Sequence, residues 1–336
     1  NLTDPVASGV GFYSFLFSNN FADQNVNVDY QGEPVIGSGD DNTFDGSERF
    51  SFPVTYSGSQ HGWNLLANPY PSPINWDSPD WVKTNVNGTV YVYDSENRSY
   101  VTFNNGAGTG GFDGNIASGQ GFFVQTSGAN PELSITESVK SDAQATFYRK
   151  KELTDILSIS FINQDGKKDE TLIRIMDNAS FDFEPEVDAL KLRGSILNIT
   201  SLDSASNNLV INTIPAFRRY IEIPLNVDTR NVGTYKLKFT EQKRLTKVRS
   251  IVLIDKYLNK KFMIARDSSY QFSITDDPES KGTNRFVVQL NSTYKPLVKG
   301  WVKTRSGEPL SNVNVKLWAT DEVQNVQTSE SGIFDL

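Results

Sequence analysis

The chain has 336 residues and a formal net charge of −8 from 32 basic and 40 acidic side chains. This balance, without a dense Lys/Arg patch, argues against a nucleic-acid partner, because binding to phosphates depends on clustered cations. Cysteine is absent and histidine occurs once, which excludes a disulfide framework, a thiolate metal site and a His-based zinc or iron centre. No apolar run approaches the roughly 18–20 residues of a membrane span, so no such span is expected.

An acidic loop lies in the first part of the chain, between Gly39 and Glu48. It contains Asp40, Asp41, Asp45 and Glu48, whose carboxylate oxygens are ligands that calcium prefers. The spacing does not fit an EF-hand, because the twelfth position counted from Asp41 is Phe52 rather than Glu. Calcium held by these four residues and a solvated loop both stay open, and the sequence indicates no other cofactor.

The segment Gly62 to Asp77 contains two tryptophans, three asparagines and three prolines. Each proline fixes its own φ and pushes the preceding residue toward extended geometry, so we expect a rigid ribbon packed against a sheet. Apolar neighbours favour core positions for Trp63 and Trp76. Among the aromatic residues near them, Trp81 and Tyr91 are the candidates for an exposed surface on which a sugar ring stacks.

Apolar and polar residues alternate in many short segments, a pattern typical of half-buried strands. Aromatic residues make up 12% of the chain, methionine occurs twice, and turn signals such as Asp165-Gly166 follow one another at short intervals. We therefore predict an all-β fold of tandem antiparallel β-sandwich domains, jelly-roll or immunoglobulin-like, with at most one short helix near Pro185 to Leu192. The alternating segments are 90–93, 172–175, 220–223, 235–239 and 313–317.

The sequence offers little that points to catalysis. The single histidine, His61, lies in a Ser- and Gly-rich turn without an apolar wall, which disfavours a Ser-His-Asp triad. The glycines of Gly106 to Gly111 match the spacing of a dinucleotide-binding loop, but no helix pattern follows them, so a hairpin loop is the better interpretation. The chain is predicted to be non-catalytic, with an enzyme that uses carboxylates alone as the remaining alternative.

Composition divides the chain into four parts. Residues 1–147 form a Gly-, Asn- and aromatic-rich β-sandwich domain, and residues 148–290 form a second one with longer apolar strands. A polar linker follows at 291–297. Residues 298–336 contain Val298-Lys-Gly-Trp-Val302, Val313-Asn-Val-Lys-Leu317 and a later Gly-x-Phe. They resemble the opening strands of a carboxypeptidase-regulatory-like domain, of transthyretin or immunoglobulin type. An immunoglobulin-type sandwich needs about 100 residues, so we expect the native polypeptide to continue.

The first two regions carry a longer resemblance. GWNLLANPYPSPINWD at 62–77 is followed by Val90 to Asp94, Tyr100 to Phe103 and Ile116 to Val124, and the second region adds further motifs as far as Arg285 to Leu290. This order is similar to a region of long, repetitive Bacteroidetes proteins that carry type IX secretion signals. The resemblance implies Sec export, passage through the outer-membrane type IX translocon, and display on or release from a Gram-negative cell. The C-terminal sorting domain of that pattern is missing from these residues.

Two further expectations follow from this resemblance. Asp203-Ser204-Ala205 looks like the three-residue site that Bacteroidetes glycosylate, with Ser204 as the acceptor. The chain is expected to be a non-catalytic segment of a secreted or surface-displayed protein, acting as an adhesin, stalk or scaffold. The alternative is a carbohydrate-binding or accessory region of a secreted polysaccharide-degrading enzyme. Surface glycans or other surface proteins are the partners in view.

Overall fold

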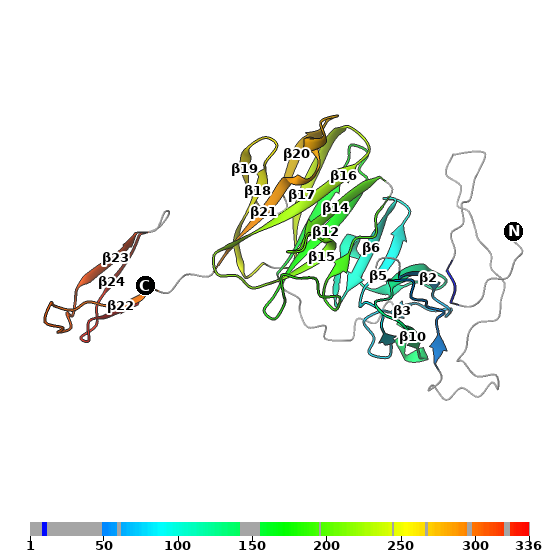
Figure 1. Cartoon of the computed structure of the whole chain (residues 1–336), viewed down its shortest axis with the longest axis horizontal. Helices are drawn as coiled ribbons and strands as arrows, with labels where there is room; N and C mark the ends of the chain where they lie inside the picture. Colours follow the sequence, from blue (N-terminus) through cyan, green and yellow to red (C-terminus); the bar gives the residue numbers. More distant parts are fainter. Residues whose placement is uncertain are drawn as a thin grey trace, which may run out of the picture.

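The computed structural model describes residues 9–11, 49–58, 62–141, 155–194, 196–243, 245–265, 268–293, 298–318 and 323–335. Within these residues the regular structure consists of β-strands and three short 3-10 turns, and its sheets pack as sandwiches. The predicted all-β fold is therefore confirmed. Figure 1 shows two groups of strands side by side, β1 to β10 and β11 to β21, with β22 to β24 beyond them. We call the first group, in residues 49–141, the first body, and the second, in residues 155–293, the second body.

The first body is built from three small sheets around an aromatic core. Its largest sheet has the order β2-β9-β5-β6-β7, and a second has the order β1-β10-β4. Trp76, Phe122 and Ile116 are fully buried between the sheets. The strands are β1 (Phe50–Ser51), β2 (Trp63–Ala67), β3 (Ile74–Asn75), β4 (Val82–Thr84), β5 (Val90–Asp94), β6 (Ser99–Asn104), β7 (Ala107–Gly108), β8 (Asn115–Ile116), β9 (Gly121–Gln125) and β10 (Glu132–Ile135).

The proline-rich ribbon runs along this core and is held by one buried amide. The Asn68 Nδ2 atom donates to the carbonyl oxygens of Ser72, Ile116 and Ala117 at 2.8, 3.1 and 3.0 Å. Its Oδ1 atom accepts the backbone N–H of Tyr70 at 3.0 Å. The prolines cannot donate backbone hydrogen bonds of their own, so the Asn68 side chain supplies the contacts that fix the ribbon.

The second body is a single eleven-stranded sheet in the order β19-β18-β21-β16-β14-β15-β12-β11-β17-β20, with β13 paired to β15. All neighbours are antiparallel except β12 and β15, which are parallel. The strands are β11 (Ile156–Ile162), β12 (Lys168–Met176), β13 (Ala189–Leu190), β14 (Leu197–Leu202), β15 (Asn208–Pro215), β16 (Tyr220–Thr229), β17 (Gly233–Lys243), β18 (Val248–Asp255), β19 (Lys260–Ile264), β20 (Ser269–Ile274) and β21 (Gly282–Ser292).

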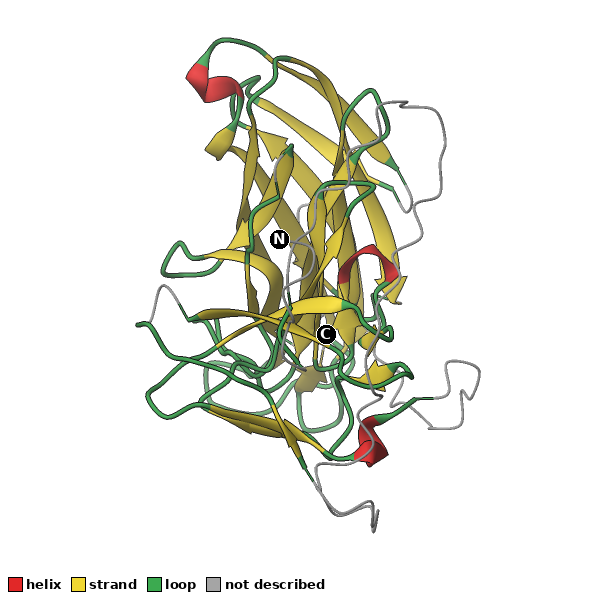
Figure 2. Ribbon diagram, turned by 90° about the vertical axis from the view of Figure 1, so that its right-hand side faces the viewer, coloured by secondary structure: helices red, strands yellow, loops and turns green. Residues whose placement is uncertain are grey.

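This sheet folds over on itself into a sandwich (Figure 2). Strand β20 lies at one end of the strand order and β21 near the other, yet the rings of Phe272 and Phe286 are 4.8 Å apart. The alternation of apolar and charged residues along β17 explains how the strand packs. Tyr235, Leu237 and Phe239 point into the core, while the intervening lysines are exposed. The two halves of one sheet thus enclose one apolar core.

The prediction allowed at most one short helix, near Pro185 to Leu192, and these residues form no helix. Residues 185–187 form a turn, in which the N–H groups of Val187 and Asp188 both reach the Glu184 carbonyl oxygen, at 3.0 and 2.8 Å. The chain then extends as β13 and pairs with β15. Proline at the start and glycine at the end fit a helix, but they fit a single turn followed by a strand equally well.

Residues 298–335 contain two small antiparallel pairs, β22 (Lys299–Trp301) with β25 (Ile333–Asp335) and β23 (Asn314–Trp318) with β24 (Val323–Gln327). Sheets therefore change between β10 and β11 and again between β21 and β22, close to the predicted domain boundaries. The boundaries themselves stay predictions.

Candidate functional site

The two bodies meet along a buried junction, formed by β5 to β7 on one side and β12, β13 and β15 on the other. Tyr91 from the first body shares an apolar cluster with Leu172 and Ile211 from the second. Its hydroxyl donates to the Leu190 carbonyl oxygen at 2.7 Å. Because both its ring and its hydroxyl are used, Tyr91 ties the bodies together by apolar burial and by a hydrogen bond.

Polar groups complete the junction. The Asn104 Nδ2 atom donates to the carbonyl oxygens of Pro185 and Asp188 at 3.2 and 2.8 Å. In the opposite direction, the Arg174 guanidinium of β12 donates to the Asn105 carbonyl oxygen at 3.0 Å. Buried polar groups cost free energy unless they are paired, so these crossed bonds favour a single relative placement of the two bodies.

Asp188 is the buried acid of the junction. Its carboxylate accepts the backbone N–H groups of Glu184 at 2.8 Å and of Thr213 at 2.6 Å. Burial raises the pKa of Asp188 to about 6, while the hydrogen bonds to its carboxylate act in the opposite direction. This carboxyl therefore takes up a proton at a mildly acidic pH, at the contact between the bodies.

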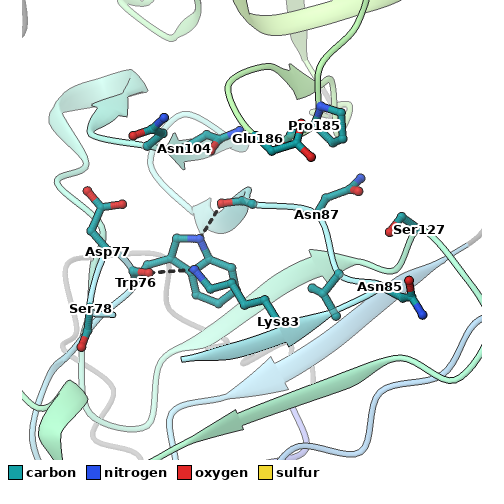
Figure 3. Close-up of a pocket in the computed structure, with 13 residues that line it drawn as sticks. Trp76, Asp77, Ser78, Lys83, Asn85, Asn87, Asn104, Ser127, Pro185 and Glu186 are labelled. Atoms are coloured by element: carbon teal, nitrogen blue, oxygen red, sulfur yellow. Dashed lines mark hydrogen bonds between the residues drawn. The ribbon is translucent and has the colours of Figure 1, made fainter. Parts of the chain in front are cut away.

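A polar cleft of about 470 Å³ opens at one end of the junction (Figure 3). Its walls come from the turn after β3, from β4 and the segment that follows it, from the end of β6, and from the 185–186 turn of the second body. Asn87, Asn104, Lys83 and Glu186 surround the same space. Both bodies contribute, so the cleft exists only while the junction is closed.

Lys83 forms part of the cleft wall together with Trp76. The Lys83 ammonium donates to the Trp76 carbonyl oxygen at 2.9 Å and lies 3.8 Å from the centre of the Trp76 ring. Burial lowers the pKa of Lys83 to about 8, and the nearby Asp77 carboxylate opposes this effect. The indole Nε1 of Trp76 in turn donates to the Gly88 carbonyl oxygen at 2.7 Å. The ammonium therefore covers the tryptophan ring and leaves no open ring face on that side.

Asparagine side chains line the rest of the cleft with their nitrogens turned toward the protein. Asn85 Nδ2 donates to the Ala129 carbonyl oxygen at 2.7 Å, and Asn87 Nδ2 donates to the Gln125 side-chain oxygen at 3.1 Å. Asn104 Nδ2 is held by the junction. Within the described residues, the side-chain oxygens of these three asparagines accept no hydrogen bond, so they remain as acceptors.

The structure corrects the prediction of an exposed aromatic surface at Trp81 and Tyr91. Trp81 is 8% exposed, its ring lies 4.6 Å from the ring of Trp76, and its Nε1 atom donates to the Asn75 carbonyl oxygen at 2.8 Å. Tyr91 is 2% exposed at the junction. A buried backbone carbonyl satisfies the polar group of each side chain, which allows both rings to be buried.

The other predicted site residues are not brought to the cleft. Ser204 is exposed in a turn between β14 and β15, where its hydroxyl donates to the Asp182 carboxylate. Its glycosylation stays a prediction. The calcium candidates Asp40, Asp41, Asp45 and Glu48, and also His61, lie outside the described residues. In the part of the chain that is described, no group of three or more His, Cys, Asp or Glu side chains is placed to bind a metal ion.

The glycine-rich loop 106–111 packs against the second body. Its last residues form a 3-10 turn, η1 (Thr109–Gly111), and the backbone of Gly110 hydrogen-bonds the Glu170 carboxylate of β12. Burial raises the pKa of Glu170, and this bond opposes the rise. The loop is thus a tight structural turn.

Sequence reasoning missed the cleft, because its walls come from residues 76–78, 83, 85–88, 104–105, 127 and 185–186. No local motif joins these segments. The one usable signal was the density of asparagine in the first region.

The fold and the cleft together define an all-β protein with two sandwich bodies joined by a buried junction. The chain belongs to the family described as "Domain of unknown function (DUF8693)", whose model matches residues 6–290 and so spans both bodies. Comparison with curated proteins and with solved structures finds no match. Among the described residues no helix has the length and apolar character needed to cross a membrane.

Proposed function

We propose that the chain is a non-catalytic segment of a secreted or surface-displayed bacterial protein that the type IX system exports, and that it acts as an adhesin, stalk or surface scaffold. The sequence resemblance supports the export route. The buried junction supports the mechanical role, because two bodies joined by Tyr91, Asn104 and Arg174 behave as one rigid unit instead of two flexibly linked domains.

A rigid unit suits a scaffold for a physical reason. Contacts between flexibly linked domains lose part of their benefit to the entropy of ordering the linker, whereas a unit of fixed shape presents its surface already ordered. Exposed strand edges and loops on both bodies would then meet a partner in a constant arrangement.

Export is tested in the source bacterium with an antibody against the chain. Intact cells should bind the antibody, and inactivation of the type IX translocon should remove the surface signal while the polypeptide accumulates inside the outer membrane. A deletion strain complemented with the gene should recover attachment to surfaces or to other cells. A surface signal independent of the translocon, or a cytoplasmic polypeptide, would contradict the export proposal.

A second candidate function is a carbohydrate-binding or accessory region of a secreted polysaccharide-degrading enzyme. The observation that favours it is the polar cleft, which has the size of a small-molecule site and is lined with free amide oxygens. A purified chain that binds soluble glycans would favour this role over a purely mechanical one.

A further inference from the structure

We propose that the junction cleft binds a neutral mono- or disaccharide, held by hydrogen bonds to asparagine side chains rather than by stacking on an aromatic ring. This inference rests on the second candidate function and specifies its ligand class and its site. The cleft volume of about 470 Å³ suits such a ligand, since small-molecule sites measure about 300–1,000 Å³.

The walls of the cleft offer hydrogen-bond acceptors. Asn85, Asn87 and Asn104 direct their amide nitrogens to protein carbonyl or amide oxygens, which leaves the three side-chain oxygens as acceptors. Ser127 adds an exposed hydroxyl at the rim. A ligand that pairs with these acceptors must carry hydrogen-bond donors. The hydroxyl groups of a sugar offer several O–H donors at short intervals.

The charged groups at the cleft disfavour an anionic ligand. Lys83 directs its ammonium to the Trp76 carbonyl oxygen and ring, and Arg174 directs its guanidinium to the Asn105 carbonyl oxygen. The Asp77 carboxylate interacts favourably with both cations. The Asp188 carboxylate also interacts favourably with Arg174, so each of these two cations, among the described residues, already has a carboxylate nearby and a carbonyl oxygen as its partner.

The Glu186 carboxylate disfavours binding of acidic sugars. Its side chain is exposed at the rim, and within the described residues it forms no ion pair. This carboxylate would repel a uronate or a sulfated sugar, whereas it would not repel a neutral sugar.

The described residues that line the cleft present no open aromatic face. Trp76 is their only aromatic side chain, it is fully buried, and Lys83 covers its ring. Sugar specificity must then come from the positions of the hydroxyl groups, because hydrogen bonds are directional and ring stacking is not.

The test is a titration of the full chain with neutral hexose and N-acetylhexosamine disaccharides, and with hexuronate-containing disaccharides of the same size. We expect the neutral probes to bind more tightly. The variant Ser127→Tyr, which fills the rim from an exposed position, should weaken binding more than tenfold. Ser95→Tyr, at a position that is also exposed but lies outside the cleft, should leave binding unchanged. Asn87→Ala should weaken binding about fivefold, the equivalent of one hydrogen bond.

A separate variant tests whether the cleft prefers neutral over acidic sugars. Glu186→Gln should strengthen binding of the hexuronate probes roughly threefold without changing the binding of the neutral ones. The matched control is Glu132→Gln, because Glu132 is exposed at the start of β10 and does not line the cleft. The inference is overturned if hexuronates bind more tightly, if Ser127→Tyr has no effect, or if no saccharide binds. Saccharide binding that persists in Ser127→Tyr would remove this site but keep the second candidate function, and the export test is independent of all these results.

Discussion

At the residue scale, one buried amide fixes the proline-rich ribbon. Asn68→Ala removes the only donor for the carbonyl oxygen of Ser72 that the described structure shows, and it also frees the Tyr70 N–H. Buried groups left without partners cost about 1–3 kcal/mol each before relaxation, so we expect roughly 2–4 kcal/mol lower stability. Urea unfolding of the full chain measures this change.

The control for Asn68 is Asn231→Ala. Asn231 is exposed and its side chain forms no hydrogen bond within the described residues, so stability should change by less than about 0.5 kcal/mol. Equal effects of the two substitutions would show that the Asn68 amide does not hold the ribbon.

Residue type alone also led to a wrong prediction of exposure for two aromatic side chains. Trp81 and Tyr91 each carry a polar group that suggests an exposed position, but both find a backbone carbonyl oxygen inside the protein. Such a partner comes from another segment, Asn75 or Leu190, and no pattern around the aromatic residue reveals it.

At the element scale, the alternation of apolar and polar residues predicts where strands lie, but it does not predict which strands pair with each other. The exposed and buried residues of β17 follow the sequence pattern, because each strand has one face on the core. The parallel pairing of β12 with β15 and the return of β20 onto β21 depend on contacts distant in sequence. In β5 the buried and exposed residues do not alternate, because two consecutive residues are buried. Val90 faces the core of the first body and Tyr91 is buried at the junction.

The turn η1 depends on a glycine for steric reasons. A Cβ atom at position 108 would lie 1.8 Å from the Phe112 carbonyl oxygen, although the backbone there is extended. Gly108→Ala must therefore displace the turn from β12, and we expect a loss of about 1–3 kcal/mol and a fall in the pKa of Glu170 as water reaches it. Thermal unfolding and a carboxyl titration by NMR measure the two effects.

Gly121→Ala is the matched control for this turn. A Cβ atom at position 121 would meet its nearest neighbour, Leu65, at 3.7 Å, which is an ordinary contact. A large loss in this variant, or an unchanged Glu170 pKa in Gly108→Ala, would contradict the steric account.

At the scale of the whole molecule, the junction couples the relative placement of the two bodies to pH. Burial raises the pKa of Asp188 from 3.8 to about 6 in the folded protein. The folded state then binds this proton more tightly than the unfolded chain does, so the stabilising contribution is fully present below pH 3.8 and is lost as the pH rises through about 6. Lys83, with its pKa lowered from 10.5 to about 8, acts in a separate window above pH 8.

Titration of Asp188 should therefore lower the stability as the pH rises from about 4 to about 6, and Asp188→Asn should abolish this contribution. The measurement is the difference in urea unfolding free energy between wild type and variant across this range, in which the contributions of other titrating groups cancel. The slope of the difference should be largest between pH 4 and 6 and should not exceed about 1.4 kcal/mol per pH unit. The hydrogen-exchange protection factors of the Tyr91 and Leu190 amides, which are corrected for the intrinsic rise of exchange with pH, should fall over the same range if the junction is the part that opens. Parallel stability curves for the two proteins would mean that Asp188 titrates as an ordinary carboxyl and that the junction does not respond to pH.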